Sequence, residues 1–195
     1  MTRSDDIHKL PADLPVPVDD GACEHLPGLA LPALALRSTG GETVDLSALA
    51  GRVVIYAHPR TGRPDEDPPS GWNEIPGARG CTPEACAFRD HYRELQALGA
   101  AVYGLSTQTT DYHRELVERL RLPYPMLSDA RLAFTQALRL PTFSVASMTL
   151  IKRLTLIAKD GRIETVFYPV FPPDEHPKEV LAWLVAQNMS SARET

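Results

Sequence analysis

Apolar runs rich in β-branched residues divide the chain into candidate strands. Arg52–Ala57 and Ala100–Ser106 are continuous apolar stretches, typical of strands at the centre of a sheet. Shorter runs predict further strands at residues 31–36, 43–46 and 125–128. The stretches 149–158 and 163–168 flank a tight turn at Lys159–Arg162, which predicts an antiparallel hairpin.

Apolar positions at helical spacing predict the intervening helices. One helix follows residue 82 and carries a single apolar face, made of Ala85, Phe88, Tyr92, Leu95 and Leu98. Further helices are expected at 109–120, at 130–138 with Asp129 as its N-cap, and at 178–186. Because strands joined by helical crossovers run parallel, the pattern predicts an α/β fold with a central mixed sheet flanked by helices.

Length and charge narrow the class of protein. A chain of 195 residues suits one domain, which we place at 28–189, after an extended arm at 1–27 and before a polar tail at 190–195. The formal net charge of −5 gives no reason to expect nucleic acid or an anionic membrane as a partner. No apolar run approaches the ~18 residues of a membrane span, and the first ten residues lack the apolar core of a signal peptide. We therefore expect a cytoplasmic protein, either a monomer or a homodimer.

Two of the three cysteines lie where a loop rich in proline and glycine enters the helix after residue 82. Thr82, Pro83 and Glu84 are typical of a helix start, with Thr82 as the expected cap. Cys81 then lies at or just before the N-terminus, where the free amide groups favour a thiolate. Cysteines in such positions have pKa values of roughly 3.5–7.5 instead of about 8.5.

The spacing of Cys81 and Cys86 suggests a redox pair that requires a conformational change. Residues five apart in a helix have Cα atoms roughly 8–9 Å apart, whereas a disulfide needs about 4.4–6.8 Å. A bond between them therefore requires the first turns to unwind. Two alternatives stay open: a small buried thiol beside an incidental one, and, with less support from the spacing, a zinc site. Cys23, in the arm, is most simply an ordinary loop cysteine, with a second resolving thiol as the alternative.

The connection from His58 to Gly80 is long for a link between a strand and a helix. It brings Cys81 to the carboxyl end of a central strand, where open α/β sheets place their sites. Trp72 and Ile75 are its large apolar residues and are expected to anchor it, or to form a substrate wall.

The segment Gly80-Cys81-Thr82-Pro83-Glu84-Ala85-Cys86-Ala87-Phe88-Arg89-Asp90 resembles the active-site helix of peroxiredoxins of the bacterioferritin-comigratory, or Q, type. Residues 53–59, 125–129 and 153–163 resemble other segments of that family in the same order, so the resemblance covers roughly 28–187. It implies a thioredoxin-like fold, here with an inserted loop before the active-site helix.

The resemblance also implies a function, the reduction of hydrogen peroxide and organic hydroperoxides by thiols. Cys81 would be the peroxidatic residue and become a sulfenic acid, and Cys86 would resolve it as a disulfide that thioredoxin reduces. Arg153 matches the family arginine that faces the peroxidatic sulfur, and Glu84 a glutamate that orients this arginine. No metal or organic cofactor is expected.

One departure from the family pattern concerns a threonine. The family has threonine three residues before the peroxidatic cysteine and proline seven before it, where this chain has Ala78 and Glu74. Thr61 or Thr82, or backbone amides of the inserted segment, would have to replace that hydroxyl. We expect the insertion to reshape the peroxide pocket without abolishing it.

The missing threonine keeps a second hypothesis open, a redox sensor that uses the same cysteine pair without catalytic turnover. A general dithiol oxidoreductase is disfavoured because it usually has two residues between its cysteines. A cysteine hydrolase would need a base, and the nearest histidines, His58 and His91, have no evident orienting partner in the sequence.

Overall fold

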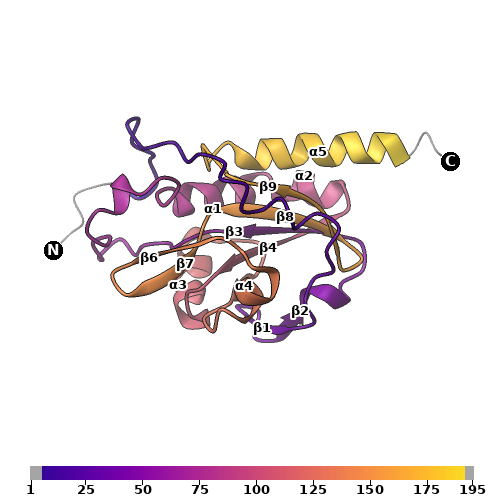
Figure 1. Cartoon of the computed structure of the whole chain (residues 1–195), viewed down its shortest axis with the longest axis horizontal. Coiled ribbons are helices and arrows are strands. Elements are labelled where there is room, and N and C mark those ends of the chain that lie inside the picture. Colours follow the sequence, from indigo (N-terminus) through magenta and orange to yellow (C-terminus); the bar gives the residue numbers. More distant parts are fainter. Residues whose placement is uncertain (1–5, 192–195) are drawn as a thin grey trace.

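In the computed structural model, which describes residues 6–191, a seven-stranded sheet has the strand order β2-β1-β5-β4-β3-β8-β9 (Figure 1). Its strands are β1 (Ala35–Ser38), β2 (Thr43–Asp45), β3 (Arg52–Ala57), β4 (Ala100–Ser106), β5 (Met126–Ser128), β8 (Leu154–Lys159) and β9 (Arg162–Phe167). Strands β3, β4 and β5 are parallel, whereas β8 is antiparallel to β3 and β1 to β5. The predicted mixed α/β sheet is confirmed.

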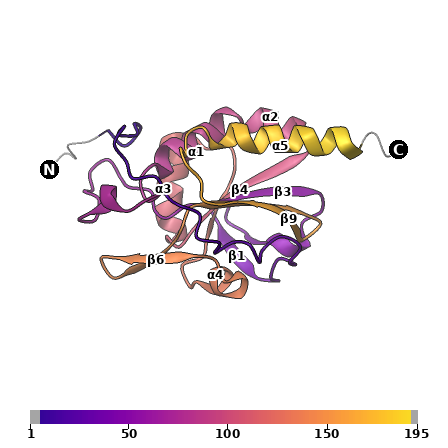
Figure 2. The same ribbon diagram turned by 45° about the horizontal axis from the view of Figure 1, so that its top comes forward.

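Helices cover both faces of this sheet (Figure 2). Within residues 6–191 the α-helices are α1 (Cys81–Asp90), α2 (Tyr92–Ala97), α3 (Thr110–Leu120), α4 (Ala133–Leu138) and α5 (His176–Ser191), and short 3₁₀ turns lie at Leu46–Ala48 and Trp72–Glu74. Apolar side chains of α1, α2, α3 and α5 form one core with one face of the sheet. The other face is covered by α4 and by residues 23–31 of the N-terminal segment. Among residues 6–191, no helix is long and apolar enough to cross a membrane.

The single strand predicted at 149–158 is wrong, because the chain turns within it. Residues 148–151 form β7 (Met148–Ile151), which pairs with β6 (Thr142–Val145), a strand that the sequence analysis missed. Residues at positive φ, Ala146 and Ser147, close this separate hairpin. The next strand, β8, begins only at Leu154, so Arg153 lies in the break between two strands and turns toward α1.

Several helix boundaries also differ from the prediction. The helix that begins at Cys81 divides at His91 into α1 and α2. Helix α4 begins later than predicted, at Ala133, although the Asp129 carboxylate still accepts hydrogen bonds from the amides of Phe134 and Thr135, at 3.0 and 2.8 Å. Helix α5 extends into the predicted tail, whose residues 192–195 lie outside the described part of the chain.

The N-terminal segment, residues 6–34, has no helix or strand and lies along the surface of the domain (Figure 1). Its residue Asp20 accepts hydrogen bonds from Lys152 Nζ at 2.7 Å and from Tyr168 Oη at 2.8 Å. Ile7 is buried beside the start of α1, where the Asp6 carbonyl accepts a hydrogen bond from Arg79 at 3.1 Å. The arm therefore contacts the region of the cysteine motif.

Candidate active site

The cysteine motif begins at the first residue of α1, Cys81, which is 3% exposed. The N-cap is Gly80 at φ +106°, so the prediction that Thr82 caps the helix is wrong. At this φ an L side chain is strained, and a Cβ would lie 2.4 Å from Pro173 and 2.8 Å from Leu10. Only glycine fits here, and it turns the loop so that the cysteine side chain faces inward.

Arg153 connects the cysteine to a buried carboxylate. Its Nη2 lies 3.1 Å from the Cys81 sulfur, and its Nη1 forms an ion pair with Glu84 Oε2. The guanidinium also donates to the carbonyls of Gly77, at 3.3 Å, Ala78, at 3.3 Å, and Arg79, at 3.2 Å. The side chains of Arg153 and Glu84 are 1% and 0% exposed, so solvent barely screens this arrangement. The structure thus brings three of the four predicted site residues into contact.

The charges around the sulfur act in opposite directions. Burial raises the pKa of the Cys81 thiol, and the Arg153 guanidinium opposes that rise by stabilising the thiolate. The Glu84 carboxylate adds to the rise, whereas the backbone N–H of Arg60 opposes it. Burial likewise raises the pKa of Glu84 to about 7, against the opposing charge of Arg153. Thiolate formation therefore depends chiefly on Arg153.

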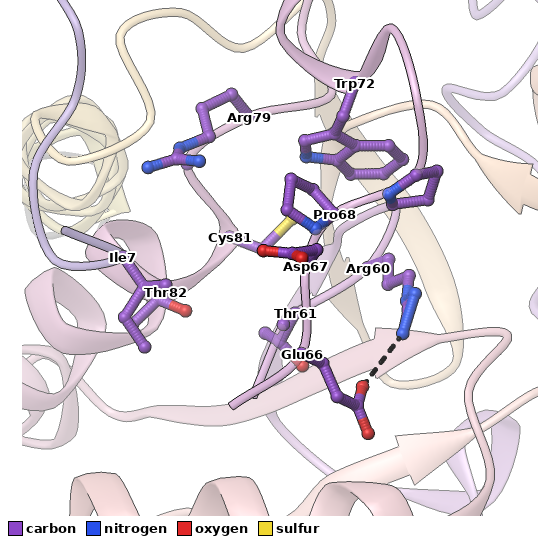
Figure 3. A pocket seen from close by; sticks show the side chains of 13 residues that line it. Ile7, Arg60, Thr61, Glu66, Asp67, Pro68, Trp72, Arg79, Cys81 and Thr82 are labelled. Atoms are coloured by element: carbon purple, nitrogen blue, oxygen red, sulfur yellow. Dashed lines mark hydrogen bonds and ion pairs between the residues drawn. The ribbon is translucent and has the colours of Figure 1, made fainter. Parts of the chain in front are cut away.

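A small cleft of about 30 Å³ lies over the Cys81 sulfur, which is room for about two water molecules. Figure 3 shows that Arg60 and Thr61, from the loop after β3, line it together with the motif residues Cys81 and Thr82. The Ala78 side chain is buried, and its backbone oxygen accepts from the Cys81 thiol at 3.7 Å. Both threonines considered as replacements for the family hydroxyl therefore line the cleft.

The inserted segment forms the outer wall of this cleft through Glu66–Pro69 and Trp72 (Figure 3). Trp72 is 6% exposed and packs with Ala78 and Leu150. Its ring lies 6.2 Å from that of Phe143 on β6. It thus both anchors the segment and lines the pocket, while Ile75 is half-buried in the same apolar cluster.

The other two cysteines have different surroundings. Cys86, the fourth predicted site residue, is half-buried on α1 and does not line the cleft. Cys23 is buried in the core on the sheet face covered by α4, and burial raises the pKa of its thiol to about 12. Neighbouring His25 bonds the Leu138 carbonyl at 2.9 Å. Cys23 lies in a segment without helix or strand, as the simpler interpretation predicted, but its side chain is part of the core.

Neither histidine considered as a hydrolase base makes a hydrogen bond to Cys81 within residues 6–191. His91 lies at the far end of α1 and bonds Glu94 Oε1 at 2.8 Å. His58 is fully buried beside the Tyr56 and His113 rings, and burial lowers its pKa well below 6.5. In the described part of the chain, no group of three or more His, Cys, Asp or Glu side chains is placed to hold a metal.

Gln108 is a site residue that the sequence analysis missed. Its side chain, buried beside the cleft, forms three hydrogen bonds to Thr61. It lies just after β4, which is parallel to β3, so its position beyond the carboxyl end of a central strand was the available signal.

A mixed sheet that presents a buried cysteine at a helix N-terminus, with an arginine against its sulfur, defines a thioredoxin-like thiol protein. Residues 26–182 match the family model described as Redoxin. Among curated proteins, the chain is 32% identical to a chloroplastic peroxiredoxin Q of Populus jackii over 80% of its length and 67% of that protein's. It is 33% identical to peroxiredoxin Q of Oryza sativa subsp. japonica, over 79% and 64%.

Among solved structures, the chain resembles peroxidoxin BcpB of Mycobacterium tuberculosis, with 27% identity and a TM-score of 0.68, over 83% of this chain and 98% of that one. The chain therefore belongs to the Redoxin family, in the branch of the peroxiredoxin Q proteins, as the cysteine motif predicted. It spans about two thirds of the length of the plant relatives.

Proposed function

We propose that the protein is a thiol peroxidase that reduces hydrogen peroxide and organic hydroperoxides through Cys81 and Cys86. The contact of Arg153 with the Cys81 sulfur carries this proposal. A guanidinium at that place stabilises the thiolate and the charge that develops on the peroxide oxygens. The small volume of the cleft suits a two-oxygen group.

The first half-reaction oxidises Cys81. The thiolate attacks one peroxide oxygen, the O–O bond breaks, and the other oxygen leaves with a proton as water or an alcohol. The sulfur is oxidised to a sulfenic acid while the peroxide is reduced. The Cys86 thiol then attacks that sulfur and water leaves, which forms the Cys81–Cys86 disulfide.

Formation of the disulfide, and its reduction in the second half-reaction, need helix α1 to open. Cys81 and Cys86 both lie within α1, and five residues of helix separate their Cα atoms too far for a disulfide. Once the helix has unwound, a thioredoxin-like dithiol reduces the exposed bond by exchange, which restores both thiols. The plant relatives are named chloroplastic, and a cytoplasmic location for this chain stays a prediction.

The test is NADPH consumption with thioredoxin, thioredoxin reductase and hydrogen peroxide. We expect turnover in the wild type, none in Cys81→Ser and strongly reduced turnover in Cys86→Ser. Cys23→Ala is the matched control, because that thiol is buried in the other core, and it should retain wild-type turnover. A wild type that forms the disulfide once without turnover, with hydrogen peroxide or an organic hydroperoxide, would favour the redox sensor.

A further inference from the structure

The buried amide of Gln108 has one possible orientation, which its backbone partners fix. Its Oε1 lies 2.9 Å from the Thr61 backbone nitrogen, which can only donate. Its Nε2 lies 3.1 Å from the Thr61 carbonyl oxygen, which can only accept. The amide therefore pairs with both backbone groups of Thr61, as a neighbouring strand would.

This orientation determines what the Thr61 hydroxyl can do. Thr61 Oγ1 lies 3.1 Å from Gln108 Oε1, an oxygen that has no hydrogen to give. The hydroxyl must therefore donate its one hydrogen to Gln108, which leaves it two lone pairs. Because Thr61 is 1% exposed and lines the cleft over Cys81, it offers that cleft a hydrogen-bond acceptor.

Gln108 is itself held at both backbone groups. Its N–H donates to Ser106 Oγ at 3.1 Å, and its carbonyl accepts from Ser128 Oγ at 2.6 Å. Ser106 in turn bonds His113 Nε2 at 2.7 Å. Burial lowers the pKa of His113 to about 4, so this histidine is neutral from pH 5 to pH 8. The carboxyl ends of β4 and β5 thus fix the loop that follows β3.

We propose that Gln108 is the positioning residue of the peroxide site, in that it makes Thr61 the acceptor for the hydroperoxide O–H. The inference rests on the proposed peroxidase function. In this arrangement Thr61 supplies the hydroxyl that Ala78 lacks, and Gln108, thirty positions further along the chain than Ala78, orients it. Either kind of hydroperoxide has an O–H to donate to Thr61 and lone pairs to accept from Arg153. In an organic hydroperoxide, which has a single O–H, Thr61 and Arg153 together therefore select which oxygen meets the thiolate.

Two substitutions at Gln108 separate positioning from simple packing. Gln108→Met keeps the volume and removes all three hydrogen bonds to Thr61. Gln108→Glu keeps the shape, and its protonated carboxyl can still donate to the Thr61 carbonyl and accept from the Thr61 N–H. Once ionised, it presents an oxygen to that carbonyl and loses the bond. Gln96→Met makes the same chemical change on the exposed face of α2 and serves as control.

The measurement is the rate of Cys81 oxidation under excess hydrogen peroxide, followed by stopped-flow fluorescence from pH 5 to pH 8. We expect Gln108→Met to lose about 10²-fold in the second-order rate constant, the usual cost of misplacing reacting groups by about 1 Å. Gln96→Met should match the wild type. The ratio of wild type to Gln108→Glu should fall toward one as the pH falls.

A peroxide-independent measurement accompanies it, the pH dependence of Cys81 alkylation by iodoacetamide in a Cys23→Ala/Cys86→Ser background. We expect Gln108→Met to change the apparent pKa of Cys81, because the loop after β3, which lines the cleft over the sulfur, loses its attachment to Gln108. This holds as a test even if the wild type fails to reduce peroxide. A pH-independent ratio for Gln108→Glu, or an unchanged alkylation profile in Gln108→Met, would overturn the inference. If Gln108→Met does not fold, the oxidation rates and the alkylation profile of Gln108→Glu across the pH range test the inference instead.

Discussion

The pairing of Arg153 with both Cys81 and Glu84 makes one substitution especially informative. Arg153→Met removes the group 3.1 Å from the sulfur and leaves the buried Glu84 without its cation. Breaking a buried ion pair costs about 3–5 kcal/mol of unfolding free energy. Losing a positioned donor at the reacting atoms slows an enzyme by about 10²–10³-fold. We expect both losses together, with a raised pKa of the Cys81 thiol.

The second variant, Arg153→Met/Glu84→Gln, separates these effects. It removes the unpaired carboxylate, so most of the unfolding free energy should return, whereas the rate of reaction with peroxide should stay low. Urea denaturation gives the first quantity and stopped-flow oxidation of Cys81 the second. Arg52→Met, which breaks the ion pair with Glu164 at the other end of β3, is the control and should leave the rate unchanged. A double variant that regains the wild-type rate with its stability would refute a chemical role for Arg153.

Three further predictions follow from burial and charge. Trp72→Ala should lower the unfolding free energy by about 3–5 kcal/mol in urea titrations, since the ring packs with Ala78 and Leu150; a loss below 1 kcal/mol would contradict this packing. Burial raises the pKa of Glu84 from 4.5 to about 7. Between these two pH values the folded protein therefore keeps a proton on Glu84 that the unfolded chain has released. That contribution to stability is complete below pH 4.5 and declines toward pH 7, and Glu84→Gln should abolish the decline in urea midpoints. Hydrogen bonds from Lys152 and Tyr168 lower the pKa of Asp20 to about 2, so its contribution is present above pH 3.8 and lost as the pH falls toward 2. Asp20→Asn should speed proteolysis of the arm at neutral pH, and equal cleavage rates would argue against the attachment.

The sequence predicted the central strands because their apolar runs are long and most of their side chains are buried, on both faces of the sheet. Strand β6 was not predicted because it lies outside the main sheet and its residues alternate only between half-buried and exposed positions. The break at Lys152–Arg153 was invisible for a related reason: a two-residue turn inside an alternating stretch leaves the hydrophobic pattern almost intact.

Only the part of the candidate site that lies in recognisable sequence motifs could be predicted. The motif from Gly80 to Asp90 identified the helix, both cysteines and Glu84, and the family resemblance added Arg153. The sequence named Thr61 only as one of several candidates for the missing hydroxyl and did not single out Gln108, because the role of each depends on where a long loop returns in space. Gln108 follows β4 and Thr61 follows β3, and only the parallel pairing of these strands brings the two residues together.

The depth of Cys81 in the folded helix has a consequence for the order of events in the proposed cycle. At 3% exposure beneath a cleft of about 30 Å³, the sulfur is accessible to small oxidants and closed to another protein. A protein dithiol can reach it only after α1 has opened to form the disulfide. The fold therefore separates oxidant from reductant by molecular size, and refolding of α1 after reduction withdraws the thiol from its reductant.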